Sequence, residues 1–481
     1  MAAGPRNSAA RAPVISQVSS FVIVLVALLL LMFVAYRGHS VILFAPLVAM
    51  LAVLCTDPAA VAPFFSGVFM ERVAGFLKLY FPVFLLGALF GKLIELSGFS
   101  QVIAAAVIRV VGQERAILAT VMVCALLTYG GVSVFVVVFA VYPFAAEVFR
   151  RGNIPKRLIP GTIALGAFTF TMDALPGTPQ IQNIIPTTFF GTDAWAAPLL
   201  GVVGSVFILL SGIAYLEWRR RAAVAANEGY GAGHSNEPEA SVVATTHNAF
   251  VALLPLLIVG VVNLLLTRAI PRMTGGTLTT VLSGSTQPLV TQVSALTAVW
   301  AVEAALLCGI LTVFALAFRD VRQRFADGSK AAVGGALLAS LNTASEYGFG
   351  AVIAALPGFL LVKQALMAIP DPLVNEAITV TTLAGITGSA SGGLSIALAA
   401  MAEQFLQTAS AAGIPPEVLH RVAAMASGGM DTLPHNGAVI TLLAVTGLTH
   451  RQSYRDVFAI TCLKTLAVFV VIAVYYLTGI V

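Results

Sequence analysis

The sequence predicts an all-α polytopic membrane protein with about 10 full spans and two re-entrant hairpins, built as two inverted repeats with broken helices. Three observations predict this fold class. First, 59% of the 481 residues are hydrophobic and only 10% are charged, whereas a soluble globular domain carries about 25% charged residues. Second, one polar stretch divides the apolar chain near its middle. Third, motifs of the first part recur in the same order in the second part.

The chain begins with a polar leader, residues 1–18, that contains Arg6 and Arg11. A signal peptide also begins with a basic leader, but the apolar run 20–36 is long and no small-residue cleavage site follows it. We therefore expect a retained membrane helix. A full span needs about 20 apolar residues, and such spans are predicted at 19–36, 40–56, 76–97, 159–190, 195–218, 249–267, 295–317, 331–347, 422–447 and 454–479.

Two apolar stretches do not fit as single spans. The stretch 116–148 is interrupted by TYGG (128–131), which leaves arms of about 15 residues, or about 22 Å of helix. The stretch 376–403 is interrupted by GITGSASGG (385–393). Both predict re-entrant hairpins, since broken backbone at membrane depth must be buried in protein or line a wet cavity. Two ordinary short spans joined by an outside loop remain the alternative for each stretch.

The polar stretch 219–248 predicts a cytoplasmic linker between a first membrane half, 19–218, and a second, 249–481. With this arginine-rich linker inside, most other Lys and Arg residues also fall inside, as the positive-inside rule requires. The first hairpin then enters from the cytoplasmic side and the second from the opposite side, so the halves are inverted. Lys464 lies within a span, and the basic residues predicted outside are Arg6, Arg11, Arg72, Lys78, Arg268, Arg272, Lys363 and Arg421.

The two halves also match in sequence. Each match alone could arise by chance between apolar segments, but four of them occur in the same order. They pair GFSQVIAAA (98–106) with GFGAVIAAL (348–356), GGVSVFVVV (130–138) with GGLSIALAA (392–400), NIPKRLI (153–159) with GIPPEVL (413–419), and MDALPGTPQ (172–180) with MDTLPHNGA (430–438).

The last pair of motifs predicts one broken helix in each half, at 159–190 and 422–447, because proline removes helical hydrogen bonds. Inverted repeats with paired broken helices are typical of secondary transporters, whose substrate binds at the interface between the repeats. We therefore expect the two breaks to face each other across a shared site.

Polar groups at the breaks and at the hairpin tips are the candidate substrate-binding residues. Helix N-termini and hydroxyl groups suit a carboxylate, and no Lys or Arg lies at either tip. The structural alternative is that Gly and Ser simply allow close helix packing. The candidates are Thr128, Tyr129, Gly130, Gly131, Ser133, Thr178, Gln180, Asn183, Ser389, Ser391, Gly392, Gly393, His435 and Asn436, with Ser395 close to the second tip.

Four residues are candidates for proton coupling: Asp173, Asp431, His435 and Glu346. A carboxylate within a span costs several kcal/mol and is by default a functional candidate. The alternatives are helix caps for the two aspartates, a structural hydrogen bond for the histidine, and a solvated helix end for the glutamate.

Other classes of function are disfavoured. GALFGK (87–92) lacks the spacing and the Ser or Thr of a phosphate loop, and no HExxH or GxSxG occurs. The four cysteines are scattered and predict neither a disulfide nor a metal site. We expect no enzyme activity, no cofactor, no metal and no nucleic-acid partner.

The stretches TYGGVSVFVVVFAVYPFA, IPKRLIPGTIALGAFTFTMDALPGTPQIQN and LPHNGAVITLLAVTGLTHRQSYRDV resemble the gluconate permease family. The resemblance implies a proton symporter for small hydroxy-carboxylates in the bacterial inner membrane, with a scaffold that forms a homodimer and a mobile domain that holds both hairpins. Family members with gluconate typically have Pro-Pro-x-Pro-Gly-Pro in the first break. This chain has Leu-Pro-Gly-Thr-Pro (175–179), which is closer to relatives that carry 3-hydroxybutyrate.

The sequence therefore predicts a proton-coupled symporter of a gluconate-like or D-3-hydroxybutyrate-like anion. A sodium-coupled carrier is the nearer alternative, since carbonyl groups beside Asn342, Thr343 and Ser389 could coordinate sodium. A passive anion channel is a further one, but the polar residues are confined to the breaks and tips rather than lining a continuous pore.

Overall fold

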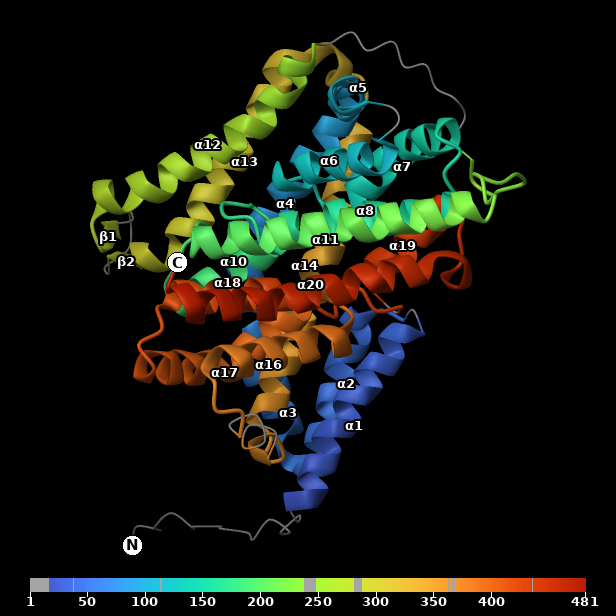
Figure 1. The fold of residues 1–481 in the computed structure, drawn as a ribbon. Helices are drawn as coiled ribbons and strands as arrows, with labels where there is room; N and C mark the ends of the chain where they lie inside the picture. Colours follow the sequence, from blue (N-terminus) through green and yellow to red (C-terminus); the bar gives the residue numbers. More distant parts are fainter. Residues whose placement is uncertain are drawn as a thin grey trace, which may run out of the picture.

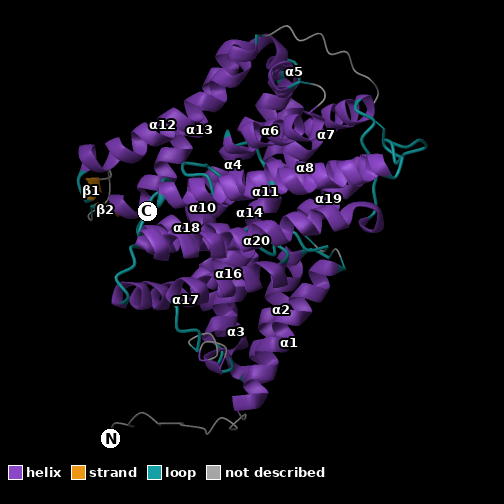
Figure 2. Cartoon of the chain, in the orientation of Figure 1, coloured by secondary structure: helices purple, strands orange, loops and turns teal. Residues whose placement is uncertain are grey.

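The computed structural model describes residues 17–37, 39–112, 115–237, 248–280, 288–361, 364, 368–434 and 436–481. These residues are mostly helical, and a short antiparallel hairpin pairs Thr277–Thr280 with Leu289–Gln292 (Figure 2). His435, Lys363 and almost all of the predicted leader lie outside the described residues.

The first half consists of two leading helices, a long helix, and the helices of the predicted hairpin and broken segment. The elements are α1 (Gln17–Tyr36), α2 (Val41–Thr56), η1 (Pro58–Ala60), α3 (Val61–Phe64), η2 (Phe65–Phe69), α4 (Met70–Leu96), α5 (Phe99–Val111), α6 (Ala116–Tyr129), α7 (Val134–Arg151), η4 (Lys156–Leu158), α8 (Ile159–Ala167), α9 (Phe170–Asp173), α10 (Ile181–Phe190) and α11 (Pro198–Ala225).

The second half repeats this order after two further long helices and the β-hairpin. Its elements are α12 (Ala249–Thr274), β1 (Thr277–Thr280), β2 (Leu289–Gln292), α13 (Val293–Arg322), α14 (Phe325–Ala355), α16 (Pro372–Thr387), α17 (Ala390–Ala411), α18 (Pro416–Ser427), α19 (Gly437–Thr446) and α20 (His450–Thr478).

Several helices are built to cross a membrane, as the all-α polytopic class requires. Five described stretches are long and apolar enough for a full span; they are Pro58–Leu96, Pro198–Ala225, Ala249–Thr274, Leu296–Arg322 and His450–Thr478. The helices α1 and α2 are also apolar, but their described apolar stretches are shorter, and the predicted spans 159–190 and 422–447 are broken. The total of about 10 crossings stays a prediction.

Each predicted hairpin is a pair of helices with an uncharged turn between them. The turn 130–133 joins α6 to α7, and Gly388 in a left-handed conformation joins α16 to α17. Each broken helix is interrupted at its predicted motif: the first is open at 174–180 and the second is open from 428 to at least 434, and the first has a further interruption at 168–169 that was not predicted. Whether the turns lie inside the bilayer, rather than in outside loops, stays a prediction.

Four features differ from the sequence prediction. The helix α11 continues to Ala225, so the linker begins later than residue 219. The amphipathic helix α5 and the β-hairpin were not predicted. The matching motifs 98–106 and 348–356 also lie in different settings, because a turn at Gly98 separates α4 from α5 whereas α14 runs on to Ala355. The three later motif pairs occupy corresponding hairpins and breaks.

The two halves interlock in space. The helices α11 and α20 lie side by side and run in opposite directions (Figure 1). The second arm of each hairpin contacts the helix after the break of the other half: α7 contacts α19, and α17 contacts α10. This exchange of partners is what an inverted repeat with two broken helices should produce.

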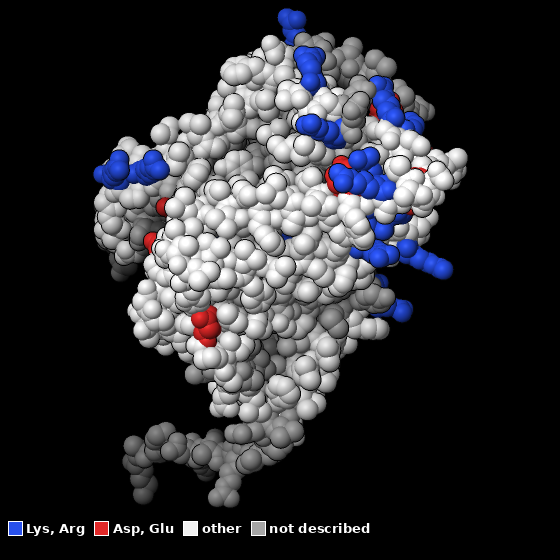
Figure 3. Space-filling view, viewed as in Figure 1, with Lys and Arg blue, Asp and Glu red and all other residues white. Residues whose placement is uncertain are grey.

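Charge is strongly segregated on the visible surface. Lys and Arg gather near the ends of α5, α7 and α11, a smaller group lies at the end of α12, and a broad uncharged surface separates them (Figure 3). The larger group lies at helix ends that the sequence analysis placed on the cytoplasmic side. The smaller group lies at the end of α12, which contains Arg268 and Arg272, and the sequence analysis placed these two residues on the outer side.

Candidate functional site

The break in the first half is held open by side chains that bind its free carbonyl groups. Gly177 adopts a left-handed conformation (φ 77°) that few other residues tolerate. Its carbonyl oxygen accepts a hydrogen bond from the Asn263 side chain (3.1 Å). The Thr178 hydroxyl donates back to the carbonyl oxygen of Thr171 (2.8 Å). Thr178 is fully buried, so this predicted substrate-binding residue serves the fold of the break in this conformation.

Asn183 is the centre of a buried network beside the break. Its amide nitrogen donates to the carbonyl oxygens of Thr178 (3.0 Å) and Ala194 (2.8 Å). Its amide oxygen accepts from Arg421 Nη1 (3.1 Å) and lies 3.2 Å from His420 Nε2. An asparagine side chain offers two donors and two acceptor sites. All are used, so Asn183 has no hydrogen-bonding capacity left for a substrate here.

Arg421 belongs to α18, and the sequence analysis used this residue only to count charges on the predicted outer side. The structure buries it completely. Besides Asn183, its guanidinium donates to the carbonyl oxygens of Asp173 (3.1 Å) and Ala196 (2.7 and 3.2 Å). A buried charge persists only when its donors are paired, and the carbonyl groups that pair them lie at the edge of the break and in the loop before α11. An arginine of the second half thus stabilises the break of the first half.

The two aspartates of the repeated motif are buried, with 2% and 4% of Asp173 and Asp431 exposed. Asp431 forms an ion pair with Lys464, which also donates to the carbonyl oxygen of Phe168 (3.1 Å). Asp173 Oδ2 has no hydrogen-bond partner among the described residues and faces Gly428, where a Cβ atom would clash with it. The two breaks therefore adjoin, as their sequence similarity led us to expect.

Neither aspartate caps the helix that follows its break. The residue before α10 is Gln180, which makes no side-chain cap. The cap of α19 is Asn436, whose Oδ1 accepts from the backbone nitrogen of Val439 (2.9 Å). The capping alternative for the aspartates is therefore wrong, because other residues occupy both cap positions.

The tip of the first hairpin is bound to the first break. Gln180 Nε2 donates to the carbonyl oxygens of Thr128 (2.8 Å) and Val132 (3.1 Å). The Tyr129 hydroxyl donates to the carbonyl oxygen of Pro176 (2.9 Å). The hydroxyl of Thr128 is buried without a partner among the described residues. The other predicted residues of this tip, Gly130, Gly131 and Ser133, form the turn that leads into α7.

The tip of the second hairpin is bound to the second break in the same manner. The Asn436 side chain donates to the carbonyl oxygen of Gly388 (2.8 Å). Ser389 caps α17, with its hydroxyl accepting from the backbone nitrogen of Gly392 (3.1 Å). In each half, a side-chain amide of the break therefore binds carbonyl groups at the tip. The predicted polar residues of a tip and its break lie together.

Glu346 lies against the second tip. It is 3% exposed and belongs to the body of α14, so the alternative of a solvated helix end is wrong. Its Oε2 has no hydrogen-bond partner among the described residues, and a Cβ atom at Gly392 would clash with it. Next to it, the hydroxyls of Thr343 and Ser391 share a hydrogen bond (3.1 Å). Gly393, the residue after Gly392, packs against the backbone of α16.

Sequence reasoning missed several buried charged residues, among them Arg421, Lys464 and Glu376. Glu376 is fully buried, and neither carboxylate oxygen has a hydrogen-bond partner among the described residues. The available signal was a charge inside or beside an apolar segment, which by default marks function. The sequence analysis used Arg421 and Lys464 only to predict the topology, and it used Glu376 only to mark the start of the second hairpin.

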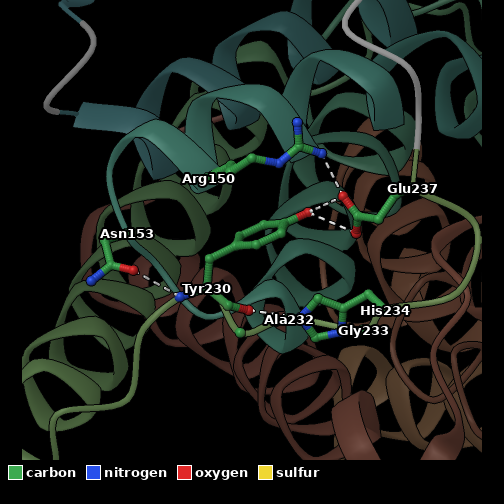
Figure 4. Close-up of a pocket in the computed structure, with 8 residues that line it drawn as sticks. Arg150, Asn153, Tyr230, Ala232, Gly233, His234 and Glu237 are labelled. Atoms are coloured by element: carbon green, nitrogen blue, oxygen red, sulfur yellow. Dashed lines mark hydrogen bonds and ion pairs between the residues drawn. The ribbon is translucent and has the colours of Figure 1, made fainter.

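A separate pocket of about 450 Å³ lies on the predicted cytoplasmic side, between the end of α7 and the loop 226–237. Arg150 donates to Glu237 (2.5 Å), which also accepts from the Tyr230 hydroxyl (Figure 4). Burial tends to raise the pKa of Glu237, but hydrogen bonds from Lys156 and Arg150 lower it below its usual value. The charged groups of this pocket bind one another. The pocket is therefore better suited to attaching the loop to α7 than to binding a substrate.

No group of three or more potential metal ligands occurs among the described residues. In comparisons with known proteins, no family model matches the chain. The chain is 59% identical over 469 residues to the uncharacterized transporter YxjC of Bacillus subtilis (strain 168), covering 96% of this chain and 99% of that protein. The crystal structure of the Alcanivorax borkumensis YdaH transporter has a TM-score of 0.51 at 16% identity, covering 96% of this chain and 98% of that one. The latter likeness concerns the fold alone.

Proposed function

The chain belongs to the family of membrane transporters that includes YxjC, and from this premise we propose a secondary active transporter that moves a small hydroxy-carboxylate together with a proton across the bacterial inner membrane. Membership of this family shows that the protein is a multi-pass membrane transporter rather than an enzyme. The substrate, the proton coupling and the membrane are our proposal.

One observation carries the proposal: Asp173 has a buried oxygen without a hydrogen-bond partner among the described residues, at the point where the two breaks adjoin. A buried carboxylate without a partner costs several kcal/mol when charged. A proton removes that cost, so this position suits a proton that binds and leaves during transport. Glu346 offers the same chemistry at the second tip.

The substrate class rests on the resemblance to gluconate permeases and on the polar groups of the tips. Helix N-termini favour anions, and both α7 and α17 begin at a tip. The Thr128 hydroxyl is buried and unpartnered there. The Leu-Pro-Gly-Thr-Pro form of the first break favours a short acid such as D-3-hydroxybutyrate over gluconate. The homodimer implied by the resemblance belongs to the same proposal, and light scattering of the purified protein tests it.

Uptake into proteoliposomes tests the function directly. Labelled gluconate and D-3-hydroxybutyrate are compared under an acid-outside gradient, a sodium gradient and no gradient. We expect accumulation of one acid only under the proton gradient. Accumulation only under the sodium gradient would mean that sodium, rather than a proton, is the coupling ion. Equilibration of the acid without accumulation would indicate a passive path.

A further inference from the structure

A small cavity of about 230 Å³ lies where the two halves meet. It is lined from α4 by Arg72 and Tyr80, from α10 by Thr188, from α14 by Tyr347 and from α17 by Ser395. The helix α10 follows the first break, and α17 begins at the second tip. We call it the α4 cavity. The mechanism described so far does not use it.

The polar feature of the α4 cavity is Ser395. This side chain is fully buried, and its hydroxyl has no hydrogen-bond partner among the described residues. A buried hydroxyl without a partner costs roughly 1–3 kcal/mol. Two of the other hydroxyls are occupied, since Tyr80 and Thr188 bind each other (2.6 Å) and Thr188 donates to a carbonyl oxygen; the third belongs to Tyr347, which also lines the cavity. Ser395 is thus left to bind a molecule inside the cavity.

The walls of the α4 cavity are aromatic. The ring of Phe76 lies 4.7 Å from that of Tyr80 and 5.7 Å from that of Tyr347, measured between centroids. Phe189 contacts Tyr347 from the other side (6.3 Å). Such walls suit a short carbon chain, because apolar surface gains from leaving water. The ring faces offer no partners for hydroxyl groups, so the polar contacts are confined to a few side chains of the lining.

The charge at the α4 cavity comes from two adjacent exposed residues, Glu71 and Arg72. The guanidinium attracts a carboxylate and can bind it with two hydrogen bonds. Glu71 opposes this attraction. An anion with a single carboxylate therefore gains from Arg72, and the neighbouring acid weakens that gain.

We propose that the α4 cavity is a binding site for a short-chain hydroxy acid, with the carboxylate at Arg72, the hydroxyl at Ser395 and the carbon chain between the rings. This inference rests on the proposed function and narrows its substrate class. A six-carbon polyhydroxy acid is disfavoured, because several of its additional hydroxyls would lie against ring faces that offer them no hydrogen bond. Ser395 lies three residues after Gly392, which faces Glu346, so the bound acid is about one helical turn from a candidate proton-binding group.

The first test is the KM of D-3-hydroxybutyrate uptake in proteoliposomes. Losing one hydrogen bond in Ser395→Ala should raise KM about 3- to 10-fold with kcat nearly unchanged. Arg72→Gln should raise KM at least as much, and Glu71→Gln should lower it. The matched controls are Ser410→Ala, an exposed serine of α17, and Lys78→Gln, an exposed lysine of α4 outside the cavity.

A second variant tests the volume of the cavity. Gly75 lines it, and a Cβ atom there meets nothing within 4 Å. Gly75→Leu should fill the space and raise KM by more than tenfold. Gly335→Leu is the control, because Gly335 on α14 also has open space around it but does not line the cavity.

A thermal-shift measurement separates this inference from the proposed function. Purified wild-type protein should melt higher in D-3-hydroxybutyrate than in gluconate, and Ser395→Ala should require several-fold more ligand for the same shift. If the variants transport with the KM of their controls, the α4 cavity is not the site and the transport proposal stands. If the wild type shows the ligand shift but no uptake, the site stands and the transport proposal fails. If neither shift nor uptake occurs, both fail.

Discussion

At the scale of single residues, Asp173 and Asp431 occupy the same place in a repeated motif but have different partners. Asp431 is paired with Lys464, whereas one oxygen of Asp173 has no partner among the described residues. A paired carboxylate is held in its charged form, and an unpaired one in an apolar interior is not. The repeat has therefore kept the residue in two different settings, and on our proposal Asp431 serves the structure while Asp173 serves coupling.

Replacing Asp173 by Asn should abolish proton-driven accumulation and leave solute exchange intact. The amide keeps the size and polarity of the side chain but cannot bind and release a proton. The measurement compares uptake under an acid-outside gradient with exchange of labelled for unlabelled acid at equal pH. Loss of exchange together with accumulation would assign Asp173 to the fold or to substrate binding instead.

The matched variant Asp431→Asn should behave differently. It leaves Lys464 as a buried cation without its carboxylate, which costs about 3–5 kcal/mol in comparable pairs. We expect a markedly lower melting temperature and loss of both exchange and accumulation. Equal stability of the two variants would contradict the division of roles.

A third residue, Glu228, should make the stability of the folded protein depend on pH. It accepts two hydrogen bonds from Arg157 (2.6 and 2.8 Å), which lower the pKa of Glu228 below its ordinary value. The folded state therefore takes up this proton less readily than the unfolded state. The stabilisation is complete above the unfolded pKa of about 4.3 and is lost as the pH falls through the lower folded pKa.

Glu228→Gln should accordingly melt below the wild type at pH 7, and the difference should shrink as the pH is lowered beneath about 4.3. Melting curves of the purified protein across this range measure it. Glu403→Gln, at an exposed glutamate of α17, serves as the control. A difference that persists unchanged at low pH would mean that the loop does not depend on the charge of Glu228.

At the scale of elements, the second hairpin depends on the close approach of α16 and α17. A Cβ atom at Gly393 would clash with the backbone of Ala384, which cannot rotate away as a side chain can. Gly393→Ala should therefore destabilise the protein by about 1–3 kcal/mol or more. Gly335→Ala in α14, where the added atom meets nothing, should be neutral or slightly stabilising. Thermal melting of the two variants measures the contrast, and equal melting temperatures would contradict it.

The breaks and tips were predictable because proline and glycine act locally. Pro176, Gly177 and Pro434 stand in motifs that combine proline with glycine or a second proline, and such motifs interrupt a helix more strongly than the single prolines inside α4 and α7 do. The partners of those breaks were not predictable, because Arg421 and Lys464 act through tertiary contacts that no spacing in the sequence encodes. The sequence analysis used Arg421 only for topology, since a cation near a helix end looks like a loop residue until the neighbouring carbonyl groups are known.

At the scale of the whole molecule, the loop 226–237 ties the two halves together on the predicted cytoplasmic side. Asn236 donates to the carbonyl oxygen of Val445 (2.5 Å), and Ser235 donates to that of Gly447 (2.9 Å). Both acceptors lie at the end of α19, beyond the second break. If transport alternates access between inverted halves, opening toward the cytoplasm has to separate this loop from α19.

A cross-link between the loop and α19 should therefore stop transport. Ser235→Cys and Ala444→Cys place thiols at two exposed positions beside these hydrogen bonds, in a chain whose native cysteines are replaced. A short bifunctional maleimide should abolish uptake by the double variant and spare each single variant. The control pair Thr279→Cys and Val290→Cys lies on paired positions of the β-hairpin, where a cross-link stays within one hairpin and uptake should continue. Continued uptake by the cross-linked loop would mean that α19 and the loop move as one body, and that access opens elsewhere.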